Sequence, residues 1–256
     1  MVHIEYVQIA ELPTWAPRRL YIYLPDDYNF TERRYPVLYM FDGHNVFYDS
    51  HATFGKSWGM NEYLQQRHVP VIIAAIECNT EGERRMEEYN PWAKYLPECG
   101  DLETLGNVTM DWMSGTLKQS IDQRYRTLSD PEHTLIAGSS MAALMALYAA
   151  SKYNGFYRRA AAISPYFPAG GPEMHKLFTE TPLAGSTRIY MDIGSEEVSH
   201  EDHHMLAELF DCAAELTRAG AQVAARVVPD AIHNEYFWEK RIPIFMNYLL
   251  GDDAPL

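Results

Sequence analysis

Short apolar runs alternate along this chain with longer segments of helical character. The short runs predict β-strands and the longer segments predict α-helices. We expect strands at residues 4–9, 19–24, 37–41, 71–77, 134–137, 160–163, 188–193 and 223–228. We expect helices at residues 60–67, 104–123, 141–152, 172–179, 200–219 and 236–250.

This alternation of strands and helices is typical of a mostly parallel sheet that helices cover on both faces. The first two strands are joined by a short connection with two prolines, residues 12–17, which predicts an antiparallel start. No repeat, low-complexity tract or Gly/Ser linker divides the chain. The pattern therefore predicts an α/β protein with one domain over residues 1–256 and an eight-stranded, mostly parallel sheet.

The composition of the chain limits the kinds of binding partner and the cellular compartment that we expect. The chain has 256 residues and is 47% hydrophobic, enough for a substantial core. Its formal net charge of -14 argues against nucleic-acid and anionic-membrane partners, because polyanions would be repelled. Three cysteines, Cys78, Cys99 and Cys212, imply no disulfide framework. With no signal-like start and no membrane-length apolar run, we expect a cytoplasmic protein; the oligomeric state is not indicated.

The most informative motif is residues 138–142, GSSMA. It matches the G-x-S-x-G nucleophile elbow of α/β-hydrolases except that alanine replaces the last glycine. Apolar runs on either side predict a short strand before it and a helix after it. The positions two before and two after the nucleophile must be small where strand and helix nearly touch, and Gly138 and Ala142 meet this need. In this register the nucleophile is Ser140 and not Ser139.

A serine hydroxyl needs a neighbouring base to react at neutral pH. In the α/β-hydrolase order the acid and then the histidine follow the serine, and the histidine lies after the last strand. His233 follows the strand predicted at 223–228 and is the only histidine beyond His204. We therefore interpret His233 as the general base, against the alternative of a loop histidine without a catalytic task.

The acid that orients the histidine should follow the preceding strand, 188–193. Gly194 ends that strand, and Glu197 lies three residues beyond it, well placed to reach back to the histidine. Glu197 is the first choice, Glu196 the second and Asp192 the third.

An oxyanion hole needs two backbone N–H donors. One belongs to the residue after the nucleophile, Met141, and the other to the loop after the third strand, residues 41–47. In this loop Gly43 permits a tight turn close to a ligand, and His44 or Asn45 would present the amide. His44 could instead line the site as a side chain or be a loop residue without that role.

Aromatic residues gather in the loops expected at the carboxyl edge of the sheet: Phe47, Trp58, Tyr89, Trp92, Tyr166 and Phe167. Phe47, Trp58, Trp92 and Tyr166 are candidate substrate contacts that could form an apolar wall for an aryl or sugar ring. The alternative, that they only pack the loops down, has equal weight for each of them.

Two polar groups have competing interpretations. His200 and His204 are four residues apart and would share a helix face, as zinc ligands do, but a solvated first helical turn is favoured. Arg84 and Arg85 could bind an acidic substrate group, although exposed loop arginines are common. We therefore expect no metal site and no cofactor.

These residues give the chain a resemblance to the putative-esterase family of α/β-hydrolases. That group includes siderophore esterases, feruloyl and acetylxylan esterases, and S-formylglutathione hydrolases. The matching segments are residues 35–47 with Trp58, then 121–127, 137–141, 164–167, 189–197 and 233–235. The likeness runs from about residue 18 to residue 250. One departure is Ala142-Ala143, where the family usually has Gly-Gly, which predicts a working but slightly displaced elbow.

The resemblance implies ester hydrolysis through a serine acyl-enzyme without metal. We therefore interpret the chain as a serine carboxylic-ester hydrolase of a small ester, with a preference for carbohydrate-linked or aryl esters drawn from the aromatic loops. Two alternatives stay open. One is a non-catalytic binding member of the fold, and the other is an acyltransferase that uses the same triad.

Overall fold

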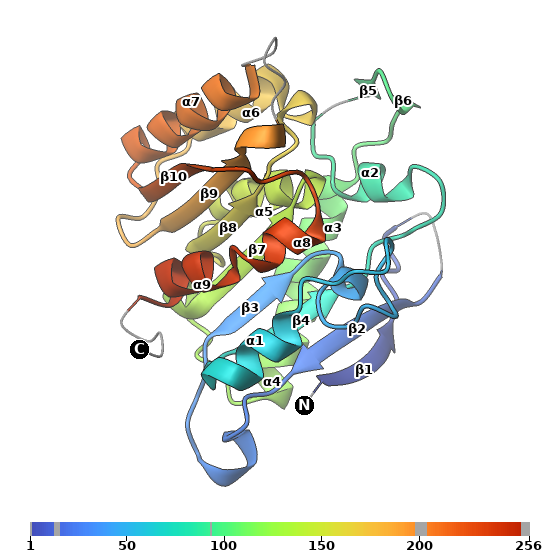
Figure 1. The fold of residues 1–256 in the computed structure, drawn as a ribbon, viewed down its shortest axis with the longest axis vertical. Helices are drawn as coiled ribbons and strands as arrows, with labels where there is room; N and C mark the ends of the chain where they lie inside the picture. The colour runs from blue at the N-terminus through green and yellow to red at the C-terminus, as the bar shows by residue number, and fades with distance from the viewer. Residues whose placement is uncertain (1, 13–15, 93, 198–203, 252–256) are drawn as a thin grey trace.

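An eight-stranded sheet forms the centre of the molecule in the computed structural model, which describes residues 2–12, 16–92, 94–197 and 204–251 (Figure 1). The strand order is β1-β2-β4-β3-β7-β8-β9-β10. The strands are β1 (Val2–Val7), β2 (Arg18–Tyr23), β3 (Val37–Met40), β4 (Ile72–Ile76), β7 (Thr134–Ser139), β8 (Arg159–Ile163), β9 (Arg188–Gly194) and β10 (Gln222–Val228).

The strand directions follow the predicted pattern. β1 pairs with β2 and β2 pairs with β4 in antiparallel fashion, while every pair from β4 to β10 is parallel. All residues of β3, β4 and β7 are buried, as expected for parallel strands that are covered on both faces. The α/β-hydrolase fold expected from the sequence is confirmed, including the antiparallel start and all eight strands.

Helices cover both faces of this sheet. They are α1 (Met60–Arg67), α2 (Arg84–Glu88), α3 (Gly106–Trp112), α4 (Lys118–Arg124), α5 (Met141–Lys152), α6 (Gly171–Glu180), α7 (His204–Arg218), α8 (Glu235–Glu239) and α9 (Ile242–Leu250). Apolar residues of α3 to α7 share one core with one face of the sheet. Those of α1, α8 and α9 share a second core with the other face.

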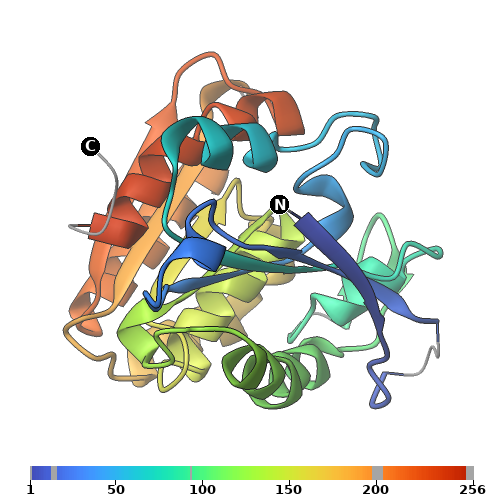
Figure 2. The ribbon, with the colours of Figure 1, turned by 90° about the horizontal axis from the view of Figure 1, so that it is seen from below.

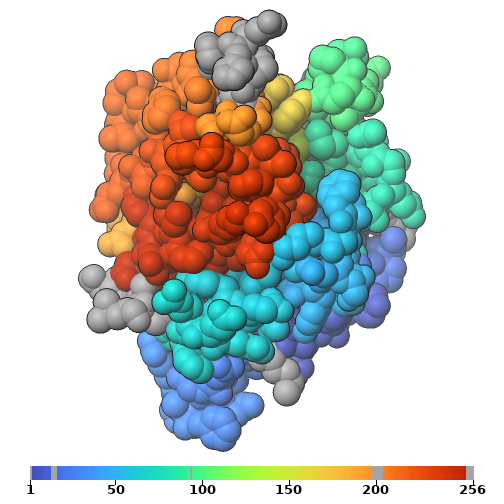
Figure 3. Space-filling model, in the orientation of Figure 1, coloured from blue at the N-terminus to red at the C-terminus, as the bar shows by residue number. Residues whose placement is uncertain are grey.

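The views agree with these two layers. Figure 2 shows α1 and the α3–α4 segment on opposite sides of the sheet. In Figure 3 the surfaces of α1 and of the C-terminal segment with α8 and α9 cover the side that faces the viewer. The central strands of the sheet therefore form an internal layer between the two sets of helices.

One predicted helix is continuous but contains a π-helical segment, and another is divided. The helix expected at 104–123 becomes α3, a π-helical turn over Met113–Leu117, and α4. The helix expected at 236–250 splits into α8 and α9 because Pro243 has no N–H to donate to the carbonyl of Glu239.

Two local features complete the description. The short hairpin of β5 (Tyr95–Leu96) and β6 (Gly100–Asp101) was not expected. The predicted start of the helix at 200–203 lies outside the described residues, and α7 is described from His204 onward. Within the described chain, every helix is too short or too polar to span a bilayer.

Candidate active site

A cavity of about 620 Å³ opens where parallel strands of the sheet end. The residues that line it come from the end of β7 and from the segments after β3, β4, β7 and β10: Asp42, His44, Asn45, Thr53, Phe54, Cys78, Thr80, Gly82, Arg85, Ser139, Ser140, His233, Asn234, Glu235 and Trp238. In open α/β sheets ligands bind outside the carboxyl ends of the strands. The cavity therefore has the position and the size of a small-molecule site.

Ser140 lies on a strained turn between β7 and α5. Its backbone has φ 60° and ψ −124°, which is costly for a residue with a side chain. Two sets of bonds hold this conformation: the Ser140 amide donates to the carbonyl of Ile163 at 3.0 Å, and the amides of Ala143 and Leu144 donate to the Ser140 carbonyl. The local geometry is that of a nucleophile elbow, with the serine at the cavity.

The close approach of strand and helix explains why alanine is accepted at position 142. A Cβ added to Gly138 would lie 2.6 Å from the Ala142 Cβ and 2.7 Å from its carbonyl carbon. The Ala142 methyl thus occupies space that Gly138 leaves open. Because one of the two facing residues lacks a side chain, the elbow forms with alanine in place of glycine.

His233 and Glu197 are brought together from the loops after β10 and β9. The His233 Nδ1 atom lies 2.8 Å from Glu197 Oε2. The His233 side chain is 42% exposed and lines the cavity that Ser140 also lines, whereas the Glu197 side chain is only 4% exposed. The imidazole packs against Trp238 in a T-shaped arrangement, with ring centroids 5.0 Å apart.

Several donors hold the Glu197 carboxylate in place. Its Oε1 accepts hydrogen bonds from the Ser164 hydroxyl at 2.7 Å, the Gly194 amide at 2.9 Å and Arg241 Nη2 at 3.1 Å. Burial favours a higher pKa for Glu197, but the hydrogen bonds from His233, Ser164 and Gly194 outweigh it and lower the pKa. Glu197 is therefore an ionised, oriented carboxylate beside the imidazole.

Sequence reasoning missed the groups behind Glu197. The Ser164 hydroxyl also lies 2.8 Å from Arg241 Nη1 and 3.1 Å from Trp238 Nε1, both of which donate to it. Arg241, 1% exposed, also donates to Asp192 Oδ1 at 2.8 Å. A signal was present for Ser164 in the matching segment 164–167, but nothing in the sequence pointed to Arg241.

The three candidate acids have different surroundings. Asp192 is fully buried and accepts from Tyr190 at 2.6 Å as well as from Arg241, while burial raises its pKa. Glu196 is exposed and accepts a bond from the Ser195 hydroxyl. Among the three, Glu197 is the one that contacts His233 in the described structure.

Asn234 and Glu235, which follow His233, lie at the start of α8. Asn234 is the N-cap of α8, and its side chain accepts a bond from the Phe237 amide at 3.2 Å. Glu235 follows as the first residue of the helix, lines the cavity and is 5% exposed, and burial raises its pKa. The cap fixes where the helix begins and therefore where His233 lies.

The loop after β3 forms a short 3₁₀ turn at the cavity. Asp42 precedes this turn in the left-handed conformation, with φ 53°, and the Asn45 amide donates to the Asp42 carbonyl at 2.7 Å. The amides of Gly43 and His44 donate to no described residue. Met141 is the first residue of α5, so its N–H has no partner within the helix. These three amides are the available donors, whereas the amide of Asn45 is engaged.

Gly43 is small for a different reason from the one expected. A Cβ at this position would lie 2.4 Å from the carbonyl oxygen of Ala75 in β4. The tight turn expected at Gly43 is present, but its left-handed residue is Asp42, and Gly43 lets the loop lie against the backbone of β4.

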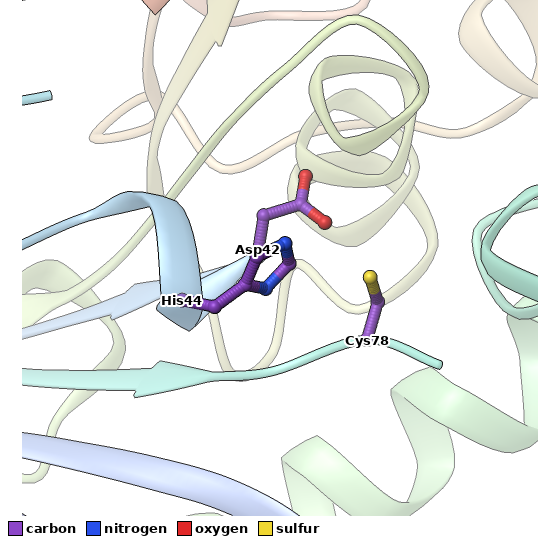
Figure 4. A group of neighbouring side chains, drawn as sticks. All are labelled: Asp42, His44 and Cys78. Atoms are coloured by element: carbon purple, nitrogen blue, oxygen red, sulfur yellow. The ribbon is translucent and has the colours of Figure 1, made fainter. Parts of the chain in front are cut away.

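Asp42, His44 and Cys78 form a buried group at the cavity (Figure 4). Arg85 donates to both oxygens of Asp42, from Nε at 2.9 Å and from Nη2 at 2.7 Å. Burial favours a higher pKa for Asp42, but Arg85 outweighs it and lowers the pKa. Arg85 thus anchors the loop, and Arg84 pairs with Glu87 at 2.8 Å.

The predicted aromatic wall is not where the sequence placed it. Phe47 and Trp58 lie in the core beneath α1 and α9, with Phe47 against Tyr21. Trp92 packs edge-on against Tyr148, and Tyr166 packs on the other core. The described residues that line the cavity include none of these four.

Two other aromatic residues line the cavity instead. Phe54, which is 80% exposed, and Trp238 are among its lining residues. Trp58 supports Trp238 from behind, with ring centroids 5.8 Å apart. The predicted histidine pair is only partly described, because His200 lies outside the described residues, whereas His204 begins α7.

Comparison with known proteins shows what this chain is similar to. A family model described as "Putative esterase" matches residues 14–243. The chain is 24% identical over 243 residues to YbbA of Bacillus subtilis (strain 168), described as an uncharacterized protein, and the match covers 91% of this chain and 93% of YbbA.

Solved structures show the same fold. An IroE-like serine hydrolase from Shewanella oneidensis is 19% identical with a TM-score of 0.75, and the match covers 97% of this chain and 79% of that one. A ferulic acid esterase is 17% identical with a TM-score of 0.64, and the match covers 98% of this chain and 97% of that one. At these identities the likeness supports the fold alone. The family match spans most of the sequence, and the chain therefore belongs to the esterase family that this model describes.

Proposed function

We propose that this protein is a serine carboxylic-ester hydrolase in which Ser140 is the nucleophile, His233 the general base and Glu197 the acid that orients the base. The observation that carries the proposal is the 2.8 Å contact between His233 Nδ1 and Glu197 at the cavity that the Ser140 elbow also lines. Membership of the esterase family supports the reaction class.

The proposed reaction has two halves. Ser140 Oγ attacks the ester carbonyl carbon while His233 Nε2 takes the hydroxyl proton, and the proton then passes to the departing alkoxide oxygen. Water repeats the sequence on the acyl-enzyme, with His233 again as base, and releases the acid. Glu197 holds the ring so that Nε2 is free for this work and stabilises the imidazolium that forms.

The developing oxyanion would be bound by backbone amides. The Met141 N–H at the start of α5 is one donor, and the N–H of Gly43 or His44 is the second. Two observations support the assignment: Met141 directly follows Ser140 at the start of α5, and His44 lines the same cavity as Ser140. A donor of this kind contributes about 3–4 kcal/mol of transition-state stabilisation in serine hydrolases.

For the substrate we propose a small ester with an aryl or sugar ring. The cavity volume of about 620 Å³ suits a small molecule, and Phe54 and Trp238 provide the apolar surfaces for a ring. A structural neighbour is described as a ferulic acid esterase, which is consistent with an aryl ester. The chemistry requires no metal or cofactor.

The test is hydrolysis of a p-nitrophenyl acetate series by the wild type, by Ser140→Ala and by the surface control Ser186→Ala. We expect Ser140→Ala to lose at least about 10⁴-fold in kcat/KM, because the covalent step is removed, and Ser186→Ala to match the wild type. Equal rates for wild type and Ser140→Ala would overturn the proposal.

A fluorophosphonate probe separates catalysis from mere binding. Stoichiometric labelling, located by mass spectrometry on Ser140 and not on Ser139, is expected of the catalytic protein. Intact protein that stays unlabelled would favour a non-catalytic binding member. Product analysis with competing alcohols then distinguishes hydrolysis from acyl transfer.

A further inference from the structure

A second group of metal-binding side chains lies between α6 and α7. His175 comes from α6, while Glu208, Cys212 and Glu215 come from α7. The ligand atoms of His175, Glu208 and Cys212 all lie within 4.8 Å of one another. Because residues four and seven apart share a helix face, α7 presents its three side chains toward one point on α6.

The two ring nitrogens of His175 have separate partners. Nδ1 lies 2.9 Å from Glu215 Oε2 and 3.1 Å from Oε1, and Nε2 lies 2.7 Å from Glu208 Oε1. A metal-binding histidine usually donates its other ring N–H to a carboxylate, which fixes the tautomer and aims the free nitrogen. Glu215 is in this position, so Nε2 is the nitrogen that faces Glu208.

The donor types suit one class of metal ion. An imidazole nitrogen, a thiolate sulfur and a carboxylate oxygen are each ligand types that zinc takes in proteins. Around a tetrahedral zinc ion the ligand atoms are about 3.3–3.8 Å apart, given bonds of about 2.0–2.3 Å. The observed separations of up to 4.8 Å and the 2.7 Å contact need only small side-chain adjustments.

Solvent can reach this group. The side chains of His175 and Glu208 are 31% and 29% exposed, whereas Cys212 is fully buried behind them. Glu208 and His204 also line a cavity of about 240 Å³. His204 precedes Glu208 by one helical turn on the same face of α7, so its side chain or a water molecule is the candidate fourth ligand.

The group at the catalytic cavity is a useful contrast. Asp42, His44 and Cys78 have the same donor types and similar spacing. There, however, the Asp42 carboxylate is bound on both oxygens by the Arg85 guanidinium. A cation would have to displace Arg85 and then remain beside its positive charge. At the α6–α7 group the neighbouring charge is the Glu215 carboxylate, which favours a cation.

We propose that His175 Nε2, Glu208 and Cys212 Sγ bind one Zn²⁺ ion, that Glu215 orients His175, and that His204 or water completes the tetrahedron. Binding displaces the thiol proton and any proton on Nε2, and no electron transfer is involved. The ion would join α6 to α7. These helices follow the segments that contain Ser164 and Glu197, so the site lies beside the scaffold of the active site without contributing to its chemistry.

The test uses the full chain after chelator treatment, titrated with Co²⁺ as a spectroscopic substitute for Zn²⁺. We expect one saturable site with a thiolate-to-Co²⁺ charge-transfer band in the near ultraviolet, which stoichiometric Zn²⁺ abolishes. Cys212→Ser should lose the band. His175→Gln and Glu208→Gln should weaken binding by at least about 10-fold.

The matched control is Cys78→Ser, which should keep the band and the affinity of the wild type. Circular dichroism checks that each variant is folded. If Cys212→Ser does not fold, the Co²⁺ affinity of Glu208→Gln is used as the test instead, because the Glu208 side chain is partly exposed. The proposal is overturned if the wild type shows no saturable binding, if folded Cys212→Ser keeps the band, or if Cys78→Ser loses it. None of these outcomes depends on esterase activity.

Discussion

Two histidines of this protein contact a glutamate at nearly the same distance but in different settings. His233 Nδ1 lies 2.8 Å from Glu197, and this is the ring nitrogen that has a described protein partner. His175 has a carboxylate at each nitrogen, with Glu215 at Nδ1 and Glu208 at Nε2. At the cavity, one ring nitrogen of the histidine contacts a carboxylate, whereas between α6 and α7 both ring nitrogens do.

The difference shows that the surroundings of Nε2 determine whether a histidine–glutamate pair can transfer protons. At the cavity, Nε2 of His233 remains available for a substrate or for Ser140, so the ring can accept and return a proton. Between α6 and α7, both nitrogens are held by anions, and the raised pKa of His175 follows from the Glu215 and Glu208 contacts, which outweigh the opposing effect of burial. That ring is suited to joining the two helices, and it would bind a metal ion only by giving up its Nε2 proton.

The largest effect on activity should come from removing the imidazole ring of His233. His233→Asn is expected to lower kcat/KM for p-nitrophenyl acetate by at least about 10⁴-fold, because no other described side chain pairs with Glu197 as a base. The thermal midpoint should change little, since the ring is 42% exposed. His133→Asn is the matched control, because His133 also contacts a carboxylate, Asp130, at 2.8 Å but lies outside the cavity. Similar losses in both variants would contradict the comparison.

A smaller loss of activity is expected when Glu197, the partner of His233, is replaced by a neutral residue. Glu197→Gln should reduce kcat by about 10²–10⁴-fold, because an amide no longer holds the tautomer or stabilises the imidazolium. The exposed neighbour Glu196→Gln should stay within about two-fold of the wild type, as surface changes usually do. Steady-state kinetics of both variants checks this. A larger loss of kcat in Glu196→Gln than in Glu197→Gln would identify Glu196 as the acid that orients His233.

The smallest effect concerns stability in acid. The pKa of Glu197 is lowered in the folded protein, so its stabilisation is present above the unfolded pKa of about 4.3 and is lost as pH falls through the folded pKa. At neutral pH, Glu197→Gln should unfold about 1–3 kcal/mol more easily, because buried donors lose a charged acceptor.

Urea unfolding of the wild type and Glu197→Gln from pH 7 downward measures this difference. It should shrink as the pH falls through the lowered pKa of Glu197. A difference that stays constant over the whole range would show that the carboxylate charge contributes nothing to stability.

Local patterns were sufficient for the framework of the site. Apolar runs marked the eight strands, and small residues at 138 and 142 marked the elbow. Because reactive residues follow the carboxyl ends of strands in this fold, strand order led to Glu197 and His233, which the structure brings into contact. Their catalytic roles stay predictions for the rate measurements above.

Other parts of the site depended on contacts that no local pattern records. Phe47 and Trp58 were expected at the cavity, but their loop folds back so that both rings enter the core. Phe54, in the same loop, is at the cavity instead. A loop has no fixed periodicity, so its sequence does not indicate which side chains turn inward.

The amino-acid sequence by itself determined the strand and helix order, the position of the strained serine and the order of the candidate triad, because these follow from local hydrophobicity, small residues and short turns. Only the tertiary structure decided which carboxylate meets His233, that Ser164 and Arg241, 77 positions apart, support that carboxylate, and that Arg85 binds Asp42. It also decided that His175 meets Glu208 and Cys212. The physical reason is that hydrogen bonds and ion pairs act over a few ångströms, and only folding brings distant residues within that range.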